Sequence, residues 1–252
     1  MTEKTDKMIS VSGLTKTIDG QQILRGINLD VYKGETLVII GRSGCGKSVL
    51  LKHLIGLMTP TSGEVWIDGQ QIVGLSERQL MPIRRTVGMM FQGGALFDSM
   101  TVEENVAFPL YESGERNADV VRKKVAEALE VVDLTGHETK KPDKISGGMK
   151  KRVALARVIV THPGCVLYDE PTAGLDPIVS DSIDHLIRRL QKRFSVTSIV
   201  VTHDMKSAAY IADKVAYVNE GKIYFYGTPE ELRTSEDELI QDFIQGRSHE
   251  KD

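Results

Sequence analysis

Eight consecutive residues have the types and spacing of a phosphate-binding loop. They follow the pattern G-x-x-x-x-G-K-S and are Gly41, Arg42, Ser43, Gly44, Cys45, Gly46, Lys47 and Ser48. Glycines allow the backbone to bend sharply and to bring its N–H groups within hydrogen-bonding distance of a phosphate. The ammonium group of Lys47 can reach the outer phosphates, and the hydroxyl of Ser48 can take a place on Mg²⁺. The segment predicts binding of a nucleoside triphosphate, ATP, together with Mg²⁺.

Two acidic residues supply chemistry that the phosphate loop lacks. Asp169 and Glu170 directly follow the apolar run 166–168. Asp169 would hold Mg²⁺, usually through water, and Glu170 would orient and deprotonate the water that attacks the γ-phosphate. Acidic residues at strand ends are common in α/β folds, so the pair taken alone leaves its role open. Together with the phosphate loop, it predicts hydrolysis of the bound nucleotide.

A second segment also has the composition of a phosphate site. Ser146, Gly147, Gly148 and Met149 stand directly before a predicted helix, and a helix N-terminus attracts anions. A glycine-rich helix cap without a ligand is the alternative. One nucleotide cannot easily bind to both phosphate-binding segments, 41–48 and 146–149, within one chain. We therefore expect a head-to-tail homodimer, with each ATP between residues 41–48 of one subunit and residues 146–149 of the other.

The elements around these residues indicate a parallel α/β core. Residues 36–40 are apolar and β-branched and predict a buried strand, while residues 49–56 have apolar positions at helical spacing before a glycine. Further predicted strands, each followed by polar residues, are 87–91 before Gln92, 166–168 before Asp169 and 198–201 before His203. His203 taken alone would more readily be a hydrogen-bonded histidine at a strand end. The fold class predicted is α/β, a P-loop NTPase with a RecA-like core.

The chain is expected to form a single domain over residues 8–233. Its core comprises residues 8–92 and 163–233, and a helical subdomain, residues 93–162, is inserted between these halves. Residues 234–252 are expected to form a C-terminal helix and a polar tail.

Local signals predict the individual elements. Turn residues between short strands indicate an antiparallel β subdomain within residues 8–74, with a hairpin at Asp68-Gly69, and residues 1–7 are expected to be a loose polar end. The strands predicted there are 9–11, 27–31, 64–67 and 71–73. The helices predicted are 76–81 ended by Pro82, 101–108 ended by Pro109, 117–132, 148–161, 180–193, 206–213 and 235–245.

Composition excludes several classes of function. The chain has 252 residues, a net charge of −3 and a pI near 6.1, so it lacks the basic surface of a nucleic-acid-binding protein and no nucleic acid partner is expected. Cys45 and Cys165 are the only cysteines and are interpreted as small apolar side chains in a reducing compartment. No apolar stretch approaches the roughly 20 residues of a membrane span, and no signal peptide is visible, which predicts a cytoplasmic location.

The order of the motifs resembles that of the nucleotide-binding subunits of ATP-binding cassette (ABC) transporters. The resemblance extends from about Ile9 to Leu232. It adds to the phosphate loop Gln92, the S-G-G run at 146–148, Asp169-Glu170-Pro171-Thr172, Ala173-Gly174-Leu175-Asp176 and Thr202-His203-Asp204. It implies that Gln92 senses Mg²⁺ and the membrane partner, that Asp176 communicates across the dimer and that His203 contacts the γ-phosphate. It also implies an integral-membrane permease as partner.

A finer resemblance lies in residues 91–110 and Met149, which are similar to the Mla-type, Mce-associated phospholipid transport ATPases of bacterial envelopes and plastids. It implies lipid transport, an MlaE-like permease, an MCE-domain lipid-binding protein and a peripheral position on the cytoplasmic face of the inner membrane. An importer of another solute, such as an amino acid, is the alternative. The apolar residues that follow Gln92 would line a groove for a short permease helix or belong to the core; they are Ala95, Leu96, Phe97, Met100, Val102, Val106 and Phe108.

Two positions depart from the pattern of cassette ATPases. Residues 15–20 contain no aromatic side chain to stack on adenine, so Ile18 would make a weaker apolar contact with the base. Met149 cannot donate an amide hydrogen bond across a dimer interface. Neither affects the phosphate chemistry, so an active enzyme is expected. A cytosolic ATPase acting on ribosomes or chromosomes and an inactive nucleotide sensor are the rival interpretations.

Overall fold

The computed structural model describes residues 6–247; residues 1–5 and 248–252 lie outside the described part. Within it, six strands form one sheet in the order β10-β9-β3-β8-β7-β6. Their bounds are β3 Thr36–Ile40, β6 Val87–Met90, β7 Cys165–Asp169, β8 Thr197–Val201, β9 Lys214–Asn219 and β10 Lys222–Gly227. Strands β9, β3, β8, β7 and β6 run parallel to one another, and β10 pairs antiparallel with β9.

Burial of the central strands explains their composition. Every residue of β3, β7 and β8 is buried, as expected for parallel strands whose two faces are both covered. Side chains on one face pack with α1 (Lys47–Leu54) and the second sheet. Those on the other face pack with a second set of helices, including α6 (Pro177–Phe194). The predicted parallel α/β core is confirmed.

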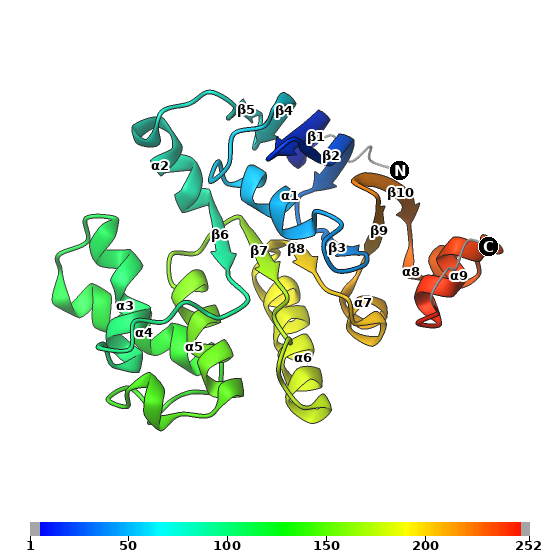
Figure 1. Cartoon of the computed structure of the whole chain (residues 1–252). Helices are drawn as coiled ribbons and strands as arrows, with labels where there is room; N and C mark the ends of the chain where they lie inside the picture. Colours follow the sequence, from blue (N-terminus) through cyan, green and yellow to red (C-terminus); the bar gives the residue numbers. More distant parts are fainter. Residues whose placement is uncertain (1–5, 248–252) are drawn as a thin grey trace.

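A four-stranded antiparallel sheet lies on the α1 side of this core (Figure 1). Its order within the described chain is β2-β1-β4-β5, formed by Gln21–Tyr32, Lys7–Ile18, Ser62–Ile67 and Gln70–Gln71. The hairpin at Asp68-Gly69 is confirmed: both residues have positive φ, 47° and 78°, as a two-residue turn between twisted strands requires.

Several predicted boundaries in this region are wrong, because β1 and β2 extend well beyond the strands predicted at 9–11 and 27–31. The strand predicted at 71–73 already ends at Gln71, because the short β5 pairs with β4 only through Gln70 and Gln71. Lys7 belongs to β1 instead of a loose end, and its Nζ lies 2.8 Å from a carboxylate oxygen of Asp30 on β2. Cys45 and Cys165 are free, and burial raises the pKa of both thiols, which agrees with their interpretation as packed side chains.

Five of the helices in the described part of the chain form two groups, α3 to α5 and α6 with α7. Figure 1 shows α3, α4 and α5 gathered beyond the β6 edge of the sheet, all within the segment 93–162, while α6 and α7 lie beneath the sheet. The helix bounds are α2 Glu77–Thr86, α3 Val102–Glu112, α4 Ala118–Val131, α5 Gly147–Ile159, α7 Met205–Ile211, α8 Pro229–Arg233 and α9 Glu238–Ile244, with a short 3₁₀ helix at Pro142–Lys144. Residues 8–92, 93–162 and 163–233 remain our proposal for the subdomains.

Two predicted helix ends are wrong. Helix α2 continues through Pro82 to Thr86, and α3 continues through Pro109 to Glu112. A proline inside a helix costs about 3 kcal/mol through a lost hydrogen bond and a steric clash. Buried apolar side chains on both sides of each proline, such as Leu80 and Ile83 around Pro82, offset that cost. Tertiary packing therefore extends helices that the local signal would end.

None of the helices formed by residues 6–247 combines the length and the apolar character needed to cross a lipid bilayer.

A buried carboxyl group joins α6 to α7 and gives a prediction about stability. Asp184 on α6 is 6% exposed and accepts a 2.6 Å hydrogen bond from the hydroxyl of Ser207 on α7. Its other carboxylate oxygen has no hydrogen-bond partner within the described part of the chain. Burial raises the pKa of Asp184 to about 6, with further increases from Asp204 and Asp181 that the Ser207 hydrogen bond and His185 oppose.

Asp184→Asn is expected to stabilise the protein at pH 8 but not at pH 4. The pKa of Asp184 is about 6 in the folded chain and 3.8 as its ordinary value, so its contribution is most favourable below pH 4 and is lost as the pH rises through 6. A neutral amide avoids the buried charge, and we expect a gain of about 1–2 kcal/mol at pH 8 after the cost of burying its N–H groups. Thermal unfolding of the variant and of the exposed control Asp98→Asn across this pH range measures the difference. A gain of the same size at both pH values would contradict the buried-charge explanation.

Candidate functional site

The phosphate loop joins β3 to α1, and its glycines occupy positions that residues with side chains could not take. A Cβ atom at Gly41 would lie 2.4 Å from the carbonyl oxygen of Val218 on the neighbouring strand β9, which excludes any side chain there. Gly46 has φ 102° and caps α1, whose first residue is Lys47. The N–H groups of the first turn of α1 therefore face the loop. The Nζ atom of Lys47 donates to the carbonyl oxygens of Gly41 at 2.7 Å and Arg42 at 3.0 Å.

Two oxygen ligands meet where the loop passes the end of β7. The hydroxyl of Ser48 donates a 2.8 Å hydrogen bond to the carboxylate of Asp169, which is the last residue of β7 and is buried. Hydroxyl and carboxylate oxygens are the ligands that Mg²⁺ prefers, and Mg²⁺ usually completes its shell with phosphates and water. In residues 6–247, no group of three or more His, Cys, Asp or Glu side chains forms a metal site without such help. The residues present fit a magnesium ion bound together with a nucleotide.

Glu170 and His203 form a second pair beside the first. The Nδ1 atom of His203 lies 2.9 Å from Oε2 of Glu170 and donates to this carboxylate. The Glu170 side chain is 13% exposed, and His203 is 69% exposed. Glu170 has φ 49°, an unfavourable value for a residue with a side chain, and its N–H donates to the carbonyl oxygen of Val201 on β8 at 2.9 Å. Strained backbone conformations occur often at functional positions, and the Glu170 side chain lines the same cavity as the phosphate loop.

One cavity connects these groups. It has a volume of about 700 Å³ and brings together the predicted residues Ile18, Gln92, Glu170 and His203 with every phosphate-loop residue except Cys45. Its complete lining is Ile18, Asp19, Gln21, Ile23, Gly41, Arg42, Ser43, Gly44, Gly46, Lys47, Ser48, Val49, Gln92, Glu170, His203 and Phe243. Asp169 does not line the cavity, but it accepts a hydrogen bond from Ser48, which does.

The sequence did not reveal five of these lining residues: Asp19, Gln21, Ile23, Val49 and Phe243, of which Phe243 lies farthest along the chain from the predicted motifs. Phe243 belongs to α9, near the end of the chain, and its ring stacks on that of Tyr217 with 4.7 Å between centroids. Arg42 of the phosphate loop donates to the carbonyl oxygen of Arg247 at 3.3 Å, which brings the C-terminal segment to the same place. The only sequence signal was an apolar face on the predicted helix 235–245, and that face indicates packing without naming the surface it covers.

The predicted second phosphate device does not line this cavity. Ser146 is the N-cap of α5 and accepts a hydrogen bond from the N–H of Met149 at 3.3 Å, and Asp176 is the N-cap of α6. The N-terminal ends of the two helices pack closely, since a Cβ atom at Gly148 would lie 2.5 Å from a methyl group of Val179. Residues 146–149 and Asp176 thus share a surface outside the nucleotide cavity of their own chain.

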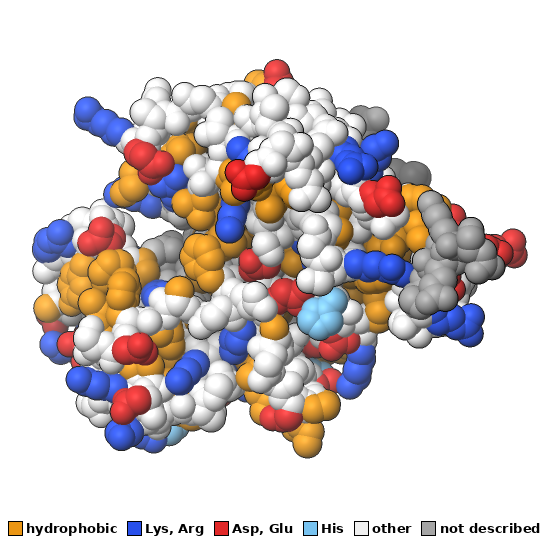
Figure 2. Space-filling model, viewed as in Figure 1, with side chains coloured by type: hydrophobic (Ala, Val, Ile, Leu, Met, Phe, Trp, Pro, Cys, Tyr) orange, Lys and Arg blue, Asp and Glu red, His pale blue; other side chains and the backbone are white. Residues whose placement is uncertain are grey.

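The apolar residues after Gln92 divide into core and surface. Val102 and Val106 are fully buried, so of the two alternatives the core is the one that holds for them. Met100 and Phe108 instead line an open groove of about 460 Å³ between α3 and α4. Phe97 is 40% exposed beside Phe108, with 4.8 Å between ring centroids. Figure 2 shows apolar side chains gathered on the face over α3 and α4.

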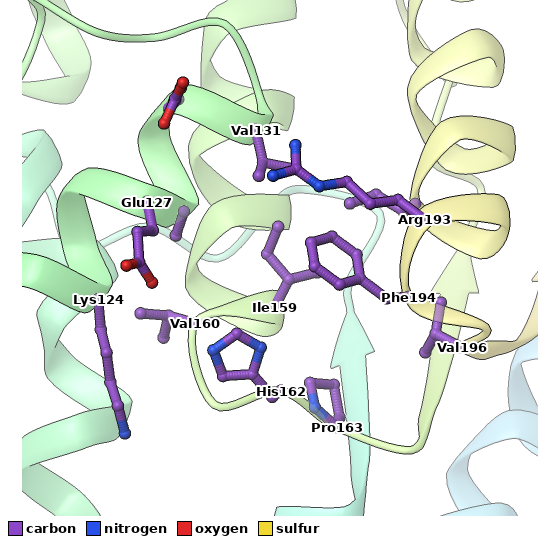
Figure 3. Close-up of a pocket in the computed structure, with 13 residues that line it drawn as sticks. Lys124, Glu127, Val131, Ile159, Val160, His162, Pro163, Arg193, Phe194 and Val196 are labelled. Carbon is purple, nitrogen blue, oxygen red and sulfur yellow. The ribbon is translucent and has the colours of Figure 1, made fainter.

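A smaller pocket of about 260 Å³ lies between α4 and the C-terminal ends of α5 and α6 (Figure 3). Apolar side chains such as Ile159, Val160 and Val196 form its interior, and Lys124, Glu127 and Arg193 surround it. None of the predicted site residues lines this pocket.

The fold and the nucleotide cavity define a P-loop ATPase: a phosphate loop, a serine and aspartate pair for the metal ion, and a carboxylate held beside them at the strand end. The family model described as ABC transporter matches residues 24–173. The chain belongs to the ATP-hydrolysing subunits of this family.

Relatives extend over nearly the whole chain. "Probable ribonucleotide transport ATP-binding protein mkl" of Mycobacterium leprae is 40% identical over 239 residues, which cover 95% of this chain and 69% of the relative. "Intermembrane phospholipid transport system ATP-binding protein MlaF" of Haemophilus influenzae is 40% identical over 241 residues, which cover 96% of this chain and 91% of the relative. Among solved structures, the dimeric post-hydrolysis state of the ATP-binding cassette MJ0796 bound to ADP and Pi matches with a TM-score of 0.81 and 32% identity, covering 88% of this chain and 99% of that one.

Proposed function

We propose that this chain is the ATP-hydrolysing subunit of an ABC transporter that moves phospholipids across or between bacterial envelope membranes. The observation that carries the proposal is the 40% identity to the Haemophilus influenzae phospholipid transport protein over 96% of this chain and 91% of that relative. The mycobacterial relative, equally identical, is named for ribonucleotide transport. Import of a small solute is therefore the second candidate.

The site residues divide the work of hydrolysis. The phosphate loop and Lys47 bind the phosphates, and Ser48, Asp169 and Gln92 would hold Mg²⁺, which would supply positive charge to neutralise the phosphates. Glu170 takes the proton of the attacking water. His203 donates to Glu170 in the structure and lines the same cavity, so it orients the carboxylate and contacts the γ-phosphate.

The chain works as a homodimer in which residues 146–149 of one subunit close the ATP site of the other. The separation of these residues from their own cavity supports this arrangement, and so does the dimeric state of the similar cassette bound to ADP and Pi. Asp176 shares the surface of residues 146–149 and lies where it would contact the partner subunit. ATP closes the dimer and hydrolysis opens it, so that nucleotide binding energy drives the permease.

The groove between α3 and α4 receives a helix of an MlaE-like permease. Its lining combines Met100, Phe108 and Tyr111 with charged residues at its edge, as a groove for an amphipathic helix requires. An MCE-domain lipid-binding protein completes the transporter. The ATPase then lies peripherally on the cytoplasmic face of the inner membrane, held there by the permease.

Phe97→Asp and Leu96→Asp are each expected to abolish copurification with the permease while basal ATP hydrolysis by the isolated subunit continues. Phe97 packs against Phe108 of the groove, and Leu96 is its neighbour in sequence, partly buried against the core, so a charge at either position would have to be desolvated on docking, at a cost of several kcal/mol. Affinity purification from membranes measures the association. Phe194→Asp, at another aromatic residue that is 44% exposed, is the matched control and should copurify normally. Normal assembly and normal stimulated turnover of both groove variants would refute this docking site.

The cargo is tested by purifying the complex from native membranes and identifying the bound molecules by mass spectrometry. Phospholipid together with a permease and an MCE-domain protein is the expected result. A ribonucleotide or amino acid with a solute-binding protein would establish the second candidate instead.

A further inference from the structure

The loop that carries Gln92 is held by α5 and not only by the strand before it. Lys151 on α5 donates a hydrogen bond from Nζ to the carbonyl oxygen of Gln92. Further along the same helix, Arg157 donates to the carbonyl oxygens of Gly94 at 2.6 Å and Ala95 at 2.7 Å. Three backbone carbonyls of one short segment are thus bonded to two side chains of a single helix.

Helix α3 holds the continuation of this loop. Asn105 is fully buried, and its amide group donates to the carbonyl oxygens of Phe97, Met100 and Thr101 at 3.1, 3.3 and 2.9 Å. Its side-chain oxygen accepts from the N–H of Phe97 at 2.9 Å. The whole loop after β6 is therefore attached to the helical group, and a displacement of these helices relative to the sheet would carry Gln92 with it.

Lys151, which bonds this loop, is itself buried. It is 7% exposed, although lysine is seldom buried. Burial lowers the pKa of its ammonium group, and attraction to Glu170 and Asp169 opposes that change. A buried ammonium group is an expensive way to fill space, because an apolar side chain would do so without a desolvation cost, so the bond to the Gln92 carbonyl is the feature to explain.

We propose that Lys151 is a positioning residue for ATP hydrolysis, which fixes the backbone of Gln92 to α5 and so sets where the Gln92 side chain stands relative to the Ser48 and Asp169 pair. Because α5 begins with residues 146–149, one helix links the surface that faces the partner subunit to the metal-sensing loop of its own site. This inference rests on the proposed role of Gln92 toward Mg²⁺.

Lys151→Met keeps the length of the side chain and removes the donor. We expect kcat to fall about tenfold and the Mg²⁺ concentration for half-maximal turnover to rise severalfold, while ATP affinity measured without Mg²⁺ stays unchanged. Lys151→Arg, which retains a charged donor, should restore most of the activity. Hydrogen exchange of the nucleotide-free protein gives a readout independent of turnover: peptides covering residues 91–97 should exchange faster in Lys151→Met, and those covering β3 and β8 should not.

Lys123→Met is the matched control, since this lysine on α4 is 79% exposed and its removal should change none of these measurements. The proposal that Lys151 fixes this loop would be refuted if Lys151→Met showed wild-type exchange of residues 91–97 together with wild-type Mg²⁺ dependence. Loss of activity that Lys151→Arg does not restore would also refute it, since the donor would then not be what matters. Gln92→Ala distinguishes the role of Gln92 from that of Lys151. If Gln92→Ala hydrolyses ATP normally, the assignment of Gln92 fails and the role of Lys151 fails with it. If Gln92→Ala is impaired and Lys151→Met is normal, only the positioning role of Lys151 is refuted.

Discussion

Glu170→Gln is expected to reduce ATP turnover by about 10²–10⁴-fold while ATP binding is retained. The amide has nearly the shape of the carboxylate, so the strained backbone at Glu170 and the contact with His203 can persist. It cannot take a proton from water at neutral pH. Phosphate release under saturating Mg-ATP measures the loss, and equilibrium binding of a fluorescent nucleotide measures what is retained.

The same variant tests the dimer. With hydrolysis blocked, ATP should hold two subunits together, so light scattering should report a dimer with Mg-ATP and a monomer with ADP. Glu236→Gln is the matched control, because Glu236 is exposed and lies in the sequence after all the predicted motifs. It should behave like the unmodified protein in both assays. Normal turnover in Glu170→Gln would remove the proton-acceptor role. A strictly monomeric Glu170→Gln protein at saturating Mg-ATP, even with the permease present, would refute the shared ATP site.

Signals that act over a few residues predicted most of the fold. The strand Thr36–Ile40 has its predicted bounds because a fully buried parallel strand needs an unbroken apolar run. The predicted helix starts at Ser76 and Thr101 carry capping boxes, since these hydrogen bonds form between residues three positions apart. Ser48 of the phosphate loop contacts Asp169 as expected, because the parallel strands that precede them end at the same edge of the sheet.

What the sequence did not reveal depends on packing between distant segments. Pro109 remains within a helix because α3 is buried on both sides of it, and no local signal reports that burial. Val102 and Phe108 have similar apolar character, yet one is core and the other lines a groove. Phe243 reaches the nucleotide cavity only because α9 folds back onto Tyr217. The bonds from Lys151 and Arg157 to the Gln92 loop were invisible for the same reason: their acceptors are backbone carbonyls about 60 positions away, which any residue type would supply.

Lys47→Ala is expected to lower ATP affinity at least about 100-fold, which corresponds to roughly 2.7 kcal/mol. Lys47 is 7% exposed, and its ammonium donates to the carbonyl oxygens of Gly41 and Arg42. The substitution therefore removes a positive charge from the phosphate site and also two bonds that shape the loop. Nucleotide binding and phosphate release should both be lost.

Two comparisons distinguish charge from loop shape. Lys52→Ala removes a lysine from the last turn of the same helix and should retain ATP binding, which controls for a general loss of positive charge on α1. Lys47→Arg keeps the charge, but the planar guanidinium cannot place a compact donor between the carbonyls of Gly41 and Arg42. If loop shape matters, Lys47→Arg should bind ATP more weakly than the unmodified protein and should also hydrolyse it slowly. If Lys47→Ala binds Mg-ATP with unchanged affinity, the cavity around residues 41–48 is not the nucleotide site, and the roles assigned to Ser48, Asp169 and Glu170 fail with it.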